Sequence, residues 1–465
     1  MSLQMDRVMT MDNQTHNKRF TRKLGLFGAV CVAMTFNVSA FAQTLDFKAC
    51  VETALNQNPE MQASSARINQ AQAALEKAQS SRLPQITLSM TGSRSDDALN
   101  AFGMKLQQRQ VNPATDFSSS ALNAPDAQSN FNTRIELLLP VWNGGKISAY
   151  EDQAQAMIEA AQKGDQAVQQ YLTFNVYQAY EAVHAARAYV LVAKQAVETA
   201  QSFVKTTKNL VEQGIVVRSE LLSAEVHQST AEVELLKAQG QEQIALDTLK
   251  MLMNIDATAE LSIGERVDLT LVEQDANELV KKALQNNLQL AAKRKEADSS
   301  AMAIDVAKTD YKPSFNVMMR KDWHDDSLGF DSDSYTVAGV FSWKITDFGV
   351  TDSSVAMATS AVAEKRAAVA SEENKLRLDV MSSWRKLQIA KQQVKSNQLA
   401  VKQASEAQQL VMKRYKSGVA TITEVLASET QLDKARADLV AAEFDVNVHK
   451  AKLMLTAGEM DIRRL

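Results

Sequence analysis

The sequence of 465 residues has few of the residues that interrupt helices. Its 15 glycines and 6 prolines allow few turns for this length, and aromatic residues make up only 6%. Ala, Leu, Val and Gln are the most frequent residues instead, a composition that is typical of long helices. The formal net charge of −4 provides no strong basic field, so we expect no nucleic-acid partner.

The sequence also lacks most of what disulfides, metal sites and active sites require. Of its cysteines, Cys31 lies in a segment that we expect to be removed, and Cys50 alone can form neither an intramolecular disulfide nor a cysteine-based metal site. The acidic stretch 322–333 lacks the glycine and the terminal glutamate of a calcium loop. No Gly-rich phosphate loop and no Gly-x-Ser-x-Gly motif occurs. We therefore predict no enzyme, no cofactor and no bound metal.

The N-terminus has the pattern of a secretory signal peptide. Basic residues at 18–23 precede an apolar run from Leu24 to Met34, and Ala40-Phe41-Ala42 forms a small-x-small cleavage site. We assign residues 1–42 to this signal. A membrane anchor is the alternative, but the run falls short of the roughly 20 apolar residues that a spanning helix needs. No longer apolar run follows, so the mature chain is expected to have no transmembrane helix.

The rest of the chain contains an internal sequence repeat. Residues 51–58 (VETALNQN) match 280–287 (VKKALQNN), and the same offset holds as far as Pro84 and Pro313. Further on, a smaller offset matches Gly145 with Gly349 and Gly214 with Gly418. The first repeat, 43–275, therefore has an insertion relative to the second, 276–465, and the last residues of the first repeat form a connecting segment.

Four short segments alternate between apolar and polar residues, as half-buried strands do. They cover about 84–92, 131–141, 313–320 and 335–345. Each is close to the length of a membrane-spanning β-strand, and one apolar face against one polar face is expected of a wall between lipid and water. A soluble sheet on a core is the alternative. The residues that we predict to face lipid include Ile135, Leu137, Leu139, Phe315, Val317, Phe341 and Trp343.

Two helical segments are too long for a compact domain. Proline is absent from 145–213 and from 349–417, and a helix of that length spans roughly 100 Å. Apolar residues recur every seven positions from Val425 to Leu453, with small residues between them, which predicts coiled-coil packing. Each long helix ends at a glycine suited to the left-handed C′ position, Gly214 or Gly418. The sequence thus predicts helical hairpins at about 145–253 and 349–456.

These features together predict an oligomer. A sheet in hydrocarbon cannot leave an unpaired edge, and four strands are too few to close a barrel with an interior. Several copies must therefore share one wall, and three copies would supply about twelve strands.

The hairpin sequence from Arg414 to Glu429 (RYKSGVATITEVLASE), its weaker copy from Leu210 to Glu225 and the duplicated plan resemble the TolC family of outer-membrane efflux proteins. The resemblance covers essentially the whole mature chain. It implies a mainly α fold with a small β part, in which duplicated coiled-coil hairpins form an α-barrel. Four strands per subunit would contribute to a twelve-stranded trimeric transmembrane β-barrel.

The resemblance also implies a function and partners. The chain would be an outer-membrane channel subunit of a tripartite efflux or type I secretion system in a Gram-negative bacterium. It would act as a homotrimer in outer-membrane lipid and extend into the periplasm. There it would meet a periplasmic adaptor and an inner-membrane pump of the resistance-nodulation-division or ABC type. The exported cargo could be small molecules, metals or proteins.

The resemblance further implies a gate at the hairpin tips. Tyr415 and Glu220 fall where a polar link between the two hairpins would form, and Glu424 falls at an acidic ring position. Ala420 and Ala427 stand where a basic partner and a second acid can occur, so we expect a weaker or rearranged closed state. Arg218 or Arg414 could take the place of the missing base.

Two other protein classes remain open at this point. A periplasmic adaptor would carry one hairpin flanked by β-rich domains, and a structural coiled-coil protein would need neither a signal peptide nor strand pairs.

Overall fold

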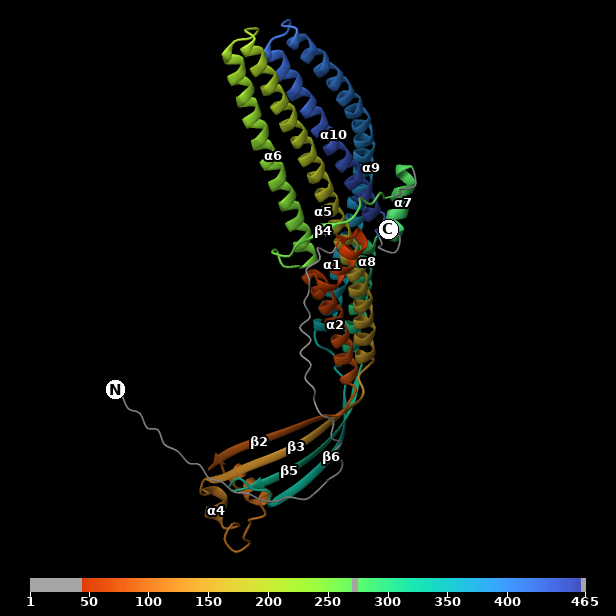
Figure 1. Ribbon diagram of the computed structural model, residues 1–465. Helices are drawn as coiled ribbons and strands as arrows, with labels where there is room; N and C mark the ends of the chain where they lie inside the picture. The colour runs from red at the N-terminus through yellow and green to blue at the C-terminus, as the bar shows by residue number, and fades with distance from the viewer. Residues whose placement is uncertain (1–43, 270–274, 461–465) are drawn as a thin grey trace, which may run out of the picture. The chain divides into compact units, whose positions relative to one another are not determined.

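The computed structural model describes residues 44–269 and 275–460. The predicted signal peptide, 1–42, lies outside the described residues, as does Cys31. Within the described ranges, no helix combines the length and the apolarity that crossing a bilayer requires. The predicted fold class is confirmed at the level of the chain: long helices dominate and a small antiparallel sheet accompanies them (Figure 1).

The elements form two matching series. The first series is β1 (Thr44–Leu45), α1 (Phe47–Gln57), α2 (Pro59–Ser80), β2 (Gln85–Ser95), α3 (Ala98–Gln107), α4 (Ser119–Asn123), β3 (Gln128–Trp142), α5 (Lys146–Glu212), α6 (Arg218–Met253) and β4 (Ser262–Ile263). The second is α7 (Ala276–Asn286), α8 (Leu288–Lys308), a 3₁₀ turn (Thr309–Tyr311), β5 (Ser314–Asp325), β6 (Ser332–Ser342), α9 (Val350–Lys416) and α10 (Ile422–Thr456). The additional helices α3 and α4 fill the insertion of the first series.

Side-chain caps fix the same helix boundaries in both series. The Asn58 side chain accepts a hydrogen bond from the backbone N–H of Glu60 and so starts α2. Asn287 does the same for α8 through the N–H of Leu290. Each asparagine satisfies an N–H group that has no partner inside the helix. The paired helices α5 and α9 each have 67 residues, which corresponds to roughly 100 Å at 1.5 Å per residue.

The four long strands form one antiparallel sheet in the order β2-β3-β5-β6. Its register aligns apolar residues across the strands: Leu88 lies opposite Ile135, and Leu137 opposite Met319, which in turn lies opposite Val337. This face is uncovered, since Ile86 and Val337 are 70% and 61% exposed. The face has the apolar residues that the alternation predicts, among them Ile135, Leu137, Leu139, Phe315, Val317 and Phe341.

The opposite face of the sheet is polar toward its outer end. There Glu136 lies opposite Arg320, and the Arg134 Nε lies 2.6 Å from the Asp322 Oδ1. Nearer the helices this face is less polar than the alternation predicts, because Leu138, Met318 and Ala338 lie side by side on it.

The prediction that Trp343 belongs to the fourth strand is wrong. β6 ends at Ser342, which pairs with Ser314 at the start of β5. The next partner along β5 is Pro313, which has no N–H to donate, so the ladder stops there. The indole Nε1 of Trp343 instead donates to the carbonyl of Tyr311 at 3.1 Å.

The main apolar core lies where the two series meet. α1, α5, α6, the end of α10 and the segment 261–269 bury a cluster that includes Tyr177, Tyr180 and Leu249. The hydroxyl of Tyr180 donates to the carbonyl of Glu265 at 2.8 Å, and β4 pairs with β1. This core holds the connecting segment against both hairpins. The boundary that we place at 275/276 stays a prediction.

The buried carboxylate of Glu181 joins three parts of the chain in the same region. Its Oε2 accepts from Arg266 Nε at 2.8 Å and from Asn447 Nδ2 at 2.9 Å. Arg266 belongs to the connecting segment and Asn447 to α10, so one side chain of α5 ties both to its own helix. A buried charge requires such partners, since removing them would leave it uncompensated.

Candidate functional site

The hairpin turns, where α5 meets α6 and α9 meets α10, lie at the helix ends far from the sheet (Figure 1). Both turns have the same backbone hydrogen bonds. The N–H of Ile215 donates to the carbonyl of Leu210, and the N–H of Val419 donates to that of Arg414, each at 2.9 Å. Gly214 and Gly418 have φ of +72° and +70°, a left-handed conformation that favours glycine. Both glycines therefore occupy the predicted C′ positions of their helices.

The two hairpins pack against each other close to these turns. Phe203 and Leu210 of α5, Ala224 of α6, and Tyr415 of α9 belong to one buried cluster, which Ala420 and Val425 complete. Tyr415 is only 1% exposed, and its ring centroid lies 5.4 Å from that of Phe203. We call this group the tip cluster. Since all four long hairpin helices contribute to it, separating the two hairpins would expose it.

Tyr415 also links the hairpins through its hydroxyl. The hydroxyl donates to the Glu220 Oε2 at 2.9 Å and lies 3.5 Å from the Thr207 Oγ1. Burial raises the pKa of Tyr415, and the bond to Glu220 adds to that rise, so the phenol keeps its proton and remains a donor. The structure thus brings together the pair that the family resemblance suggested. The role of this pair in a gate stays a prediction.

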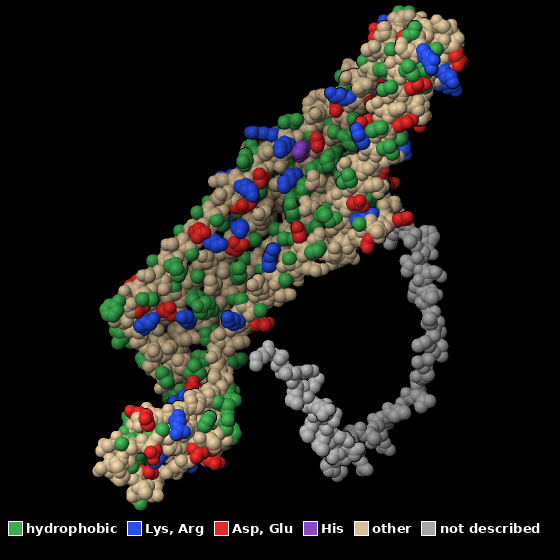
Figure 2. Space-filling view, turned by 90° about the vertical axis from the view of Figure 1, so that its left-hand side faces the viewer, with side chains coloured by type: hydrophobic (Ala, Val, Ile, Leu, Met, Phe, Trp, Pro, Cys, Tyr) green, Lys and Arg blue, Asp and Glu red, His purple; other side chains and the backbone are tan. Residues whose placement is uncertain are grey.

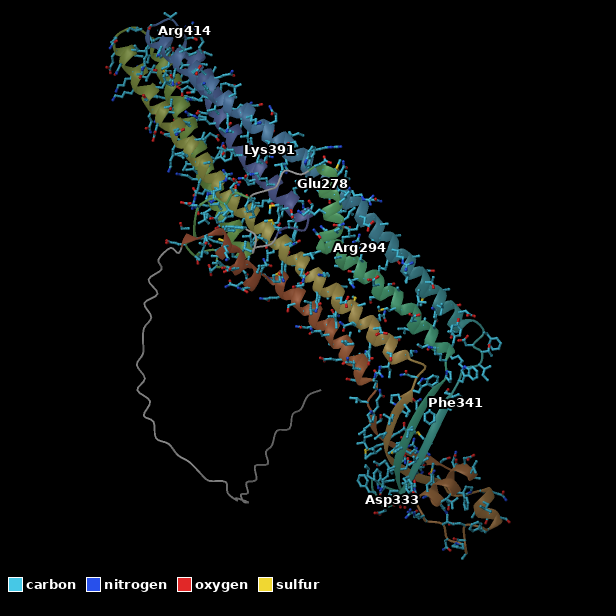
Figure 3. The ribbon with its side chains drawn as sticks, turned by 90° about the vertical axis from the view of Figure 1, so that its right-hand side faces the viewer. Glu278, Arg294, Asp333, Phe341, Lys391 and Arg414 are labelled. Atoms are coloured by element: carbon cyan, nitrogen blue, oxygen red, sulfur yellow. The ribbon has the colours of Figure 1, made fainter. Side chains whose placement is uncertain are left out.

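The other predicted tip residues are not part of this link. Arg218, Arg414 and Glu424 are exposed, and Figure 3 places Arg414 at the end of its hairpin. Among the described residues, no ion pair within 4.0 Å joins either arginine to Glu220 or Glu424. Ala420 is buried in the tip cluster, so the position where a basic partner can occur is filled by packing here.

A buried acid below the tip, Glu429, is not among the residues predicted from the sequence. Glu429 of α10 is 4% exposed, and its Oε1 accepts from the Gln408 Nε2 of α9 at 3.0 Å. Burial raises the pKa of Glu429, and the nearby charge of Asp433 raises it further, while Arg436 opposes the rise. The heptad pattern of α10 indicates that Glu429 is buried, because Glu429 lies four residues after Val425 and three before Leu432, on the buried face of the helix.

We expect Glu429→Gln to stabilise the folded protein at neutral pH. Because the pKa of the folded state lies above the ordinary value of 4.5, the folded chain binds this proton more tightly than the unfolded chain does. The resulting stability is present at low pH and is lost as the pH rises through the raised pKa. Thermal unfolding of the wild type should therefore shift to lower temperature over that interval, and unfolding of the variant should shift less.

Glu424→Gln is the matched control for that experiment. Glu424 is exposed on the same helix, so its replacement should leave the pH dependence of unfolding as it is. An equal pH dependence in wild type and Glu429→Gln would show that Glu429 has no such effect.

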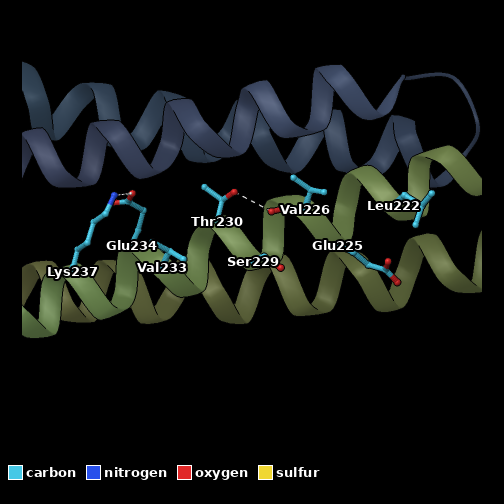
Figure 4. A pocket seen from close by; sticks show the side chains of 8 residues that line it. All are labelled: Leu222, Glu225, Val226, Ser229, Thr230, Val233, Glu234 and Lys237. Atoms are coloured by element: carbon cyan, nitrogen blue, oxygen red, sulfur yellow. Dashed lines mark hydrogen bonds and ion pairs between the residues drawn. The ribbon is translucent and has the colours of Figure 1, made fainter.

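Apolar stripes run along two of the hairpin helices and are largely exposed in the described chain. On α6 the stripe includes Leu222, Val226 and Val233, which line the shallow groove in Figure 4. Figure 2 shows such hydrophobic side chains interleaved with charged ones along the helices. The stripe of α9 comprises residues that are 56% to 68% exposed, namely Leu378, Ile389, Leu399 and Leu410.

The described residues contain no group of three or more His, Cys, Asp or Glu side chains placed to hold a metal ion. The histidines in this part of the chain lie on different elements: His184, His227 and His449 on α5, α6 and α10, and His324 on β5.

Comparisons with known proteins agree with this architecture. Residues 50–254 and 279–459 match the family model described as outer membrane efflux protein. No curated protein sequence matches the chain.

Solved structures share the fold. The outer membrane protein VceC of Vibrio cholerae is 18% identical, with a TM-score of 0.71 over 89% of this chain and 96% of that one. The CmeC outer membrane channel of Campylobacter jejuni is 16% identical, with a TM-score of 0.72 over 89% and 85%. The open state of the MtrE outer membrane channel of Neisseria gonorrhoeae is 16% identical, with a TM-score of 0.69 over 89% and 88%.

Proposed function

Because this chain belongs to the outer membrane efflux protein family, we propose that three copies of it form a tube through which an efflux or type I secretion system exports its cargo. The tube crosses the outer membrane of a Gram-negative bacterium and extends into the periplasm. One observation carries the proposal: all four strands present most of their apolar residues on one uncovered face, while among the described residues β2 and β6 each pair with a strand on one side only.

The apolar face of the sheet supports contact with lipid. Leu88, Val337 and Phe341 are 61% to 65% exposed on it, and Figure 3 places Phe341 and Asp333 at opposite ends of β6. In water such a face would be a liability, whereas in hydrocarbon it is the favourable surface. The polar face, with Arg134, Glu136 and Arg320, would then line the water-filled interior.

The free sheet edges support closure by further copies. β2 and β6 have 11 residues each, and within the described ranges the outer edge of each leaves a row of backbone groups without partners. In lipid each unsatisfied group costs several kcal/mol, so the edges must pair. The four strands alternate in direction, so β6 of one copy can pair antiparallel with β2 of the next. Three copies would give about twelve strands, within the range of known barrels.

The internal repeat supports the same assembly for the helices. Within the chain α5 packs against α10 and α8. The equivalents of these two pairs are α9 with α6 and α9 with α2, which make no comparable contacts within the described chain. Contacts between copies would supply them, and the stripes on α6 and α9 would then cover each other.

The tip cluster supports a closed periplasmic end. The link between Tyr415 and Glu220 and the apolar packing below it hold the two hairpins together. A periplasmic adaptor, bound to an inner-membrane pump, would open the tube by separating the hairpins. An adaptor-like function for this chain itself has less support, because an adaptor carries one hairpin and this chain has two.

The assembly can be tested by fractionation. We expect the mature protein in the outer membrane fraction, as an oligomer that survives mild detergent and separates into single chains on heating. We expect the oligomer to survive mild detergent because edge pairing and helix packing between copies extend over the whole subunit. The boiled sample is the control, and a soluble periplasmic monomer would contradict the proposal.

A further inference from the structure

The turn that leads into α9 contains Phe348, whose exposure and backbone conformation are not explained by contacts within its own chain. Phe348 is 97% exposed and has a φ of +52°, although it is neither glycine nor a small polar residue. A bulky side chain in this conformation is strained, and such strain persists where the surroundings require it. Nothing within the described chain packs against this ring.

The same turn in the first repeat shows what its neighbours are. Phe348 is equivalent to Gly144, which has a φ of +66°. A Cβ on Gly144 would lie 2.7 Å from the Cβ of Lys312, so this turn touches the connection between α8 and β5. Two residues on, the Lys146 Nζ forms an ion pair of 2.8 Å with Asp310 in that same connection. The turn before α5 in the first repeat therefore contacts the connection between α8 and β5 in the second repeat.

We call this contact between the turn before a long helix and the connection before a strand the joint. Among the described residues, the equivalent joint, between the turn before α9 and the connection between α2 and β2, is not formed within the chain. Lys312 is equivalent to Leu83, and Lys146 is equivalent to Val350. In place of a glycine and charged side chains, this joint has Phe348, Leu83 and Val350, which are 97%, 60% and 61% exposed. The positions that touch in one joint are thus both exposed and apolar in the other.

We propose that Phe348 and Val350 of one copy pack against Leu83 of the next copy. This inference rests on the proposed assembly, in which β6 pairs with the neighbouring β2. The intrachain pair Leu137 and Met319 is equivalent to Phe341 and the neighbour's Met90, which sets the register of that pairing. The ladder then continues past Ser342 to Trp343, and Phe348 arrives beside the neighbouring Leu83. The joint within a chain is polar and the joint between copies is apolar.

Paired cysteines test this contact in the assembled protein. Leu83→Cys with Phe348→Cys, in a chain whose buried Cys50 is replaced by alanine, should give covalent dimers and trimers under mild oxidation. Either single variant should remain a single chain on a denaturing gel. Met90→Cys with Phe341→Cys reports the strand register of the same interface.

The two pairs separate the possible outcomes. Links at 90/341 without links at 83/348 would overturn this inference and leave the assembly standing. No links at either pair, together with a monomeric protein, would overturn the proposed function as well. Quenching of a probe on Phe348→Cys by nitroxides inside the bilayer would show that lipid, and not a second copy, covers this position, which would also overturn the inference.

Phe348→Gly provides a second test, in which the dissociation temperature of the oligomer is expected to fall. Glycine relieves the strained φ, so in the isolated chain it should be neutral or stabilising. In the assembly it removes the contact, so the oligomer should separate into single chains at a lower temperature than the wild type. Leu328→Gly, at an exposed apolar residue of the β5–β6 loop, is the control and should leave this temperature unchanged. A dissociation temperature that stays the same or rises in Phe348→Gly would overturn the inference.

Discussion

Leu88→Arg is expected to prevent the protein from accumulating as an oligomer in the outer membrane. Leu88 lies opposite Ile135 near the middle of the uncovered apolar face and is 65% exposed. An arginine on the lipid face of a barrel costs about 2–4 kcal/mol at the bilayer midplane. Three copies would carry that cost together, roughly 6–12 kcal/mol if the sites act independently. The measurement is the amount of heat-sensitive oligomer in outer membrane fractions.

Thr87→Arg is the matched control for this experiment. Thr87 is the preceding residue of the same strand, points to the polar face and lies opposite Glu136. An arginine there meets an opposite charge across the strands, an arrangement that is neutral or favourable. Its oligomer should therefore accumulate as the wild type does. Equal loss in both variants would indicate a general folding defect, and no loss in Leu88→Arg would show that this face does not meet lipid.

The elements with strong periodicity could be predicted from the sequence, because their pattern depends on the chain alone. The period-two alternation predicts that the apolar residues of β3 and β5 share one face, as they do, and the absence of proline predicts α5 and α9. The strand ends depended on pairing instead. β5 continues to Asp325, which lies opposite Phe131 of β3, and β6 begins at Ser332, which lies opposite His324 of β5, so pairing extends both strands beyond the alternating segments.

Pairing also explains why Trp343 could not be placed from its alternation. Its side chain has the parity of Phe341 and the strand pattern continues through it, yet Pro313 removes the partner that a further ladder bond needs. Alternation shows that a residue could occupy a strand, but hydrogen bonding to the neighbouring strand determines whether it does. Beside Trp343, the described chain offers no such hydrogen-bonding strand.

The tip site was predictable in part. Gly214 and Gly418 follow from helix-ending chemistry, which is local. The approach of Tyr415 to Glu220 is a contact between different hairpins, and only the family resemblance suggested it. The burial of Ala420 and Glu429 depends on how four helices cross, which the heptad of one helix constrains but does not fix.

Tyr415→Ala is expected to open the periplasmic end and let bulky antibiotics pass through the tube. The ring is buried in the tip cluster, and truncating a large buried aromatic side chain typically costs 3–5 kcal/mol. If the cluster forms only while the hairpins are together, that cost shifts the ratio of closed to open tips by roughly 10²- to 10³-fold or more. The measurements are antibiotic susceptibility of cells that rely on this channel and its conductance in planar bilayers.

Two variants at the same link and one remote tyrosine make this test specific. Tyr415→Phe keeps the ring against Phe203 and loses only the bond to Glu220, so together with Glu220→Ala it should give a smaller leak than Tyr415→Ala. A hydrogen bond to a charged group contributes about 1.5–3 kcal/mol when it is shielded from water. Tyr171→Ala, at a half-exposed residue of α5 far from the tip, should leave permeability unchanged. If folded trimers of Tyr415→Ala are no leakier than this control, Tyr415 does not hold the tips closed.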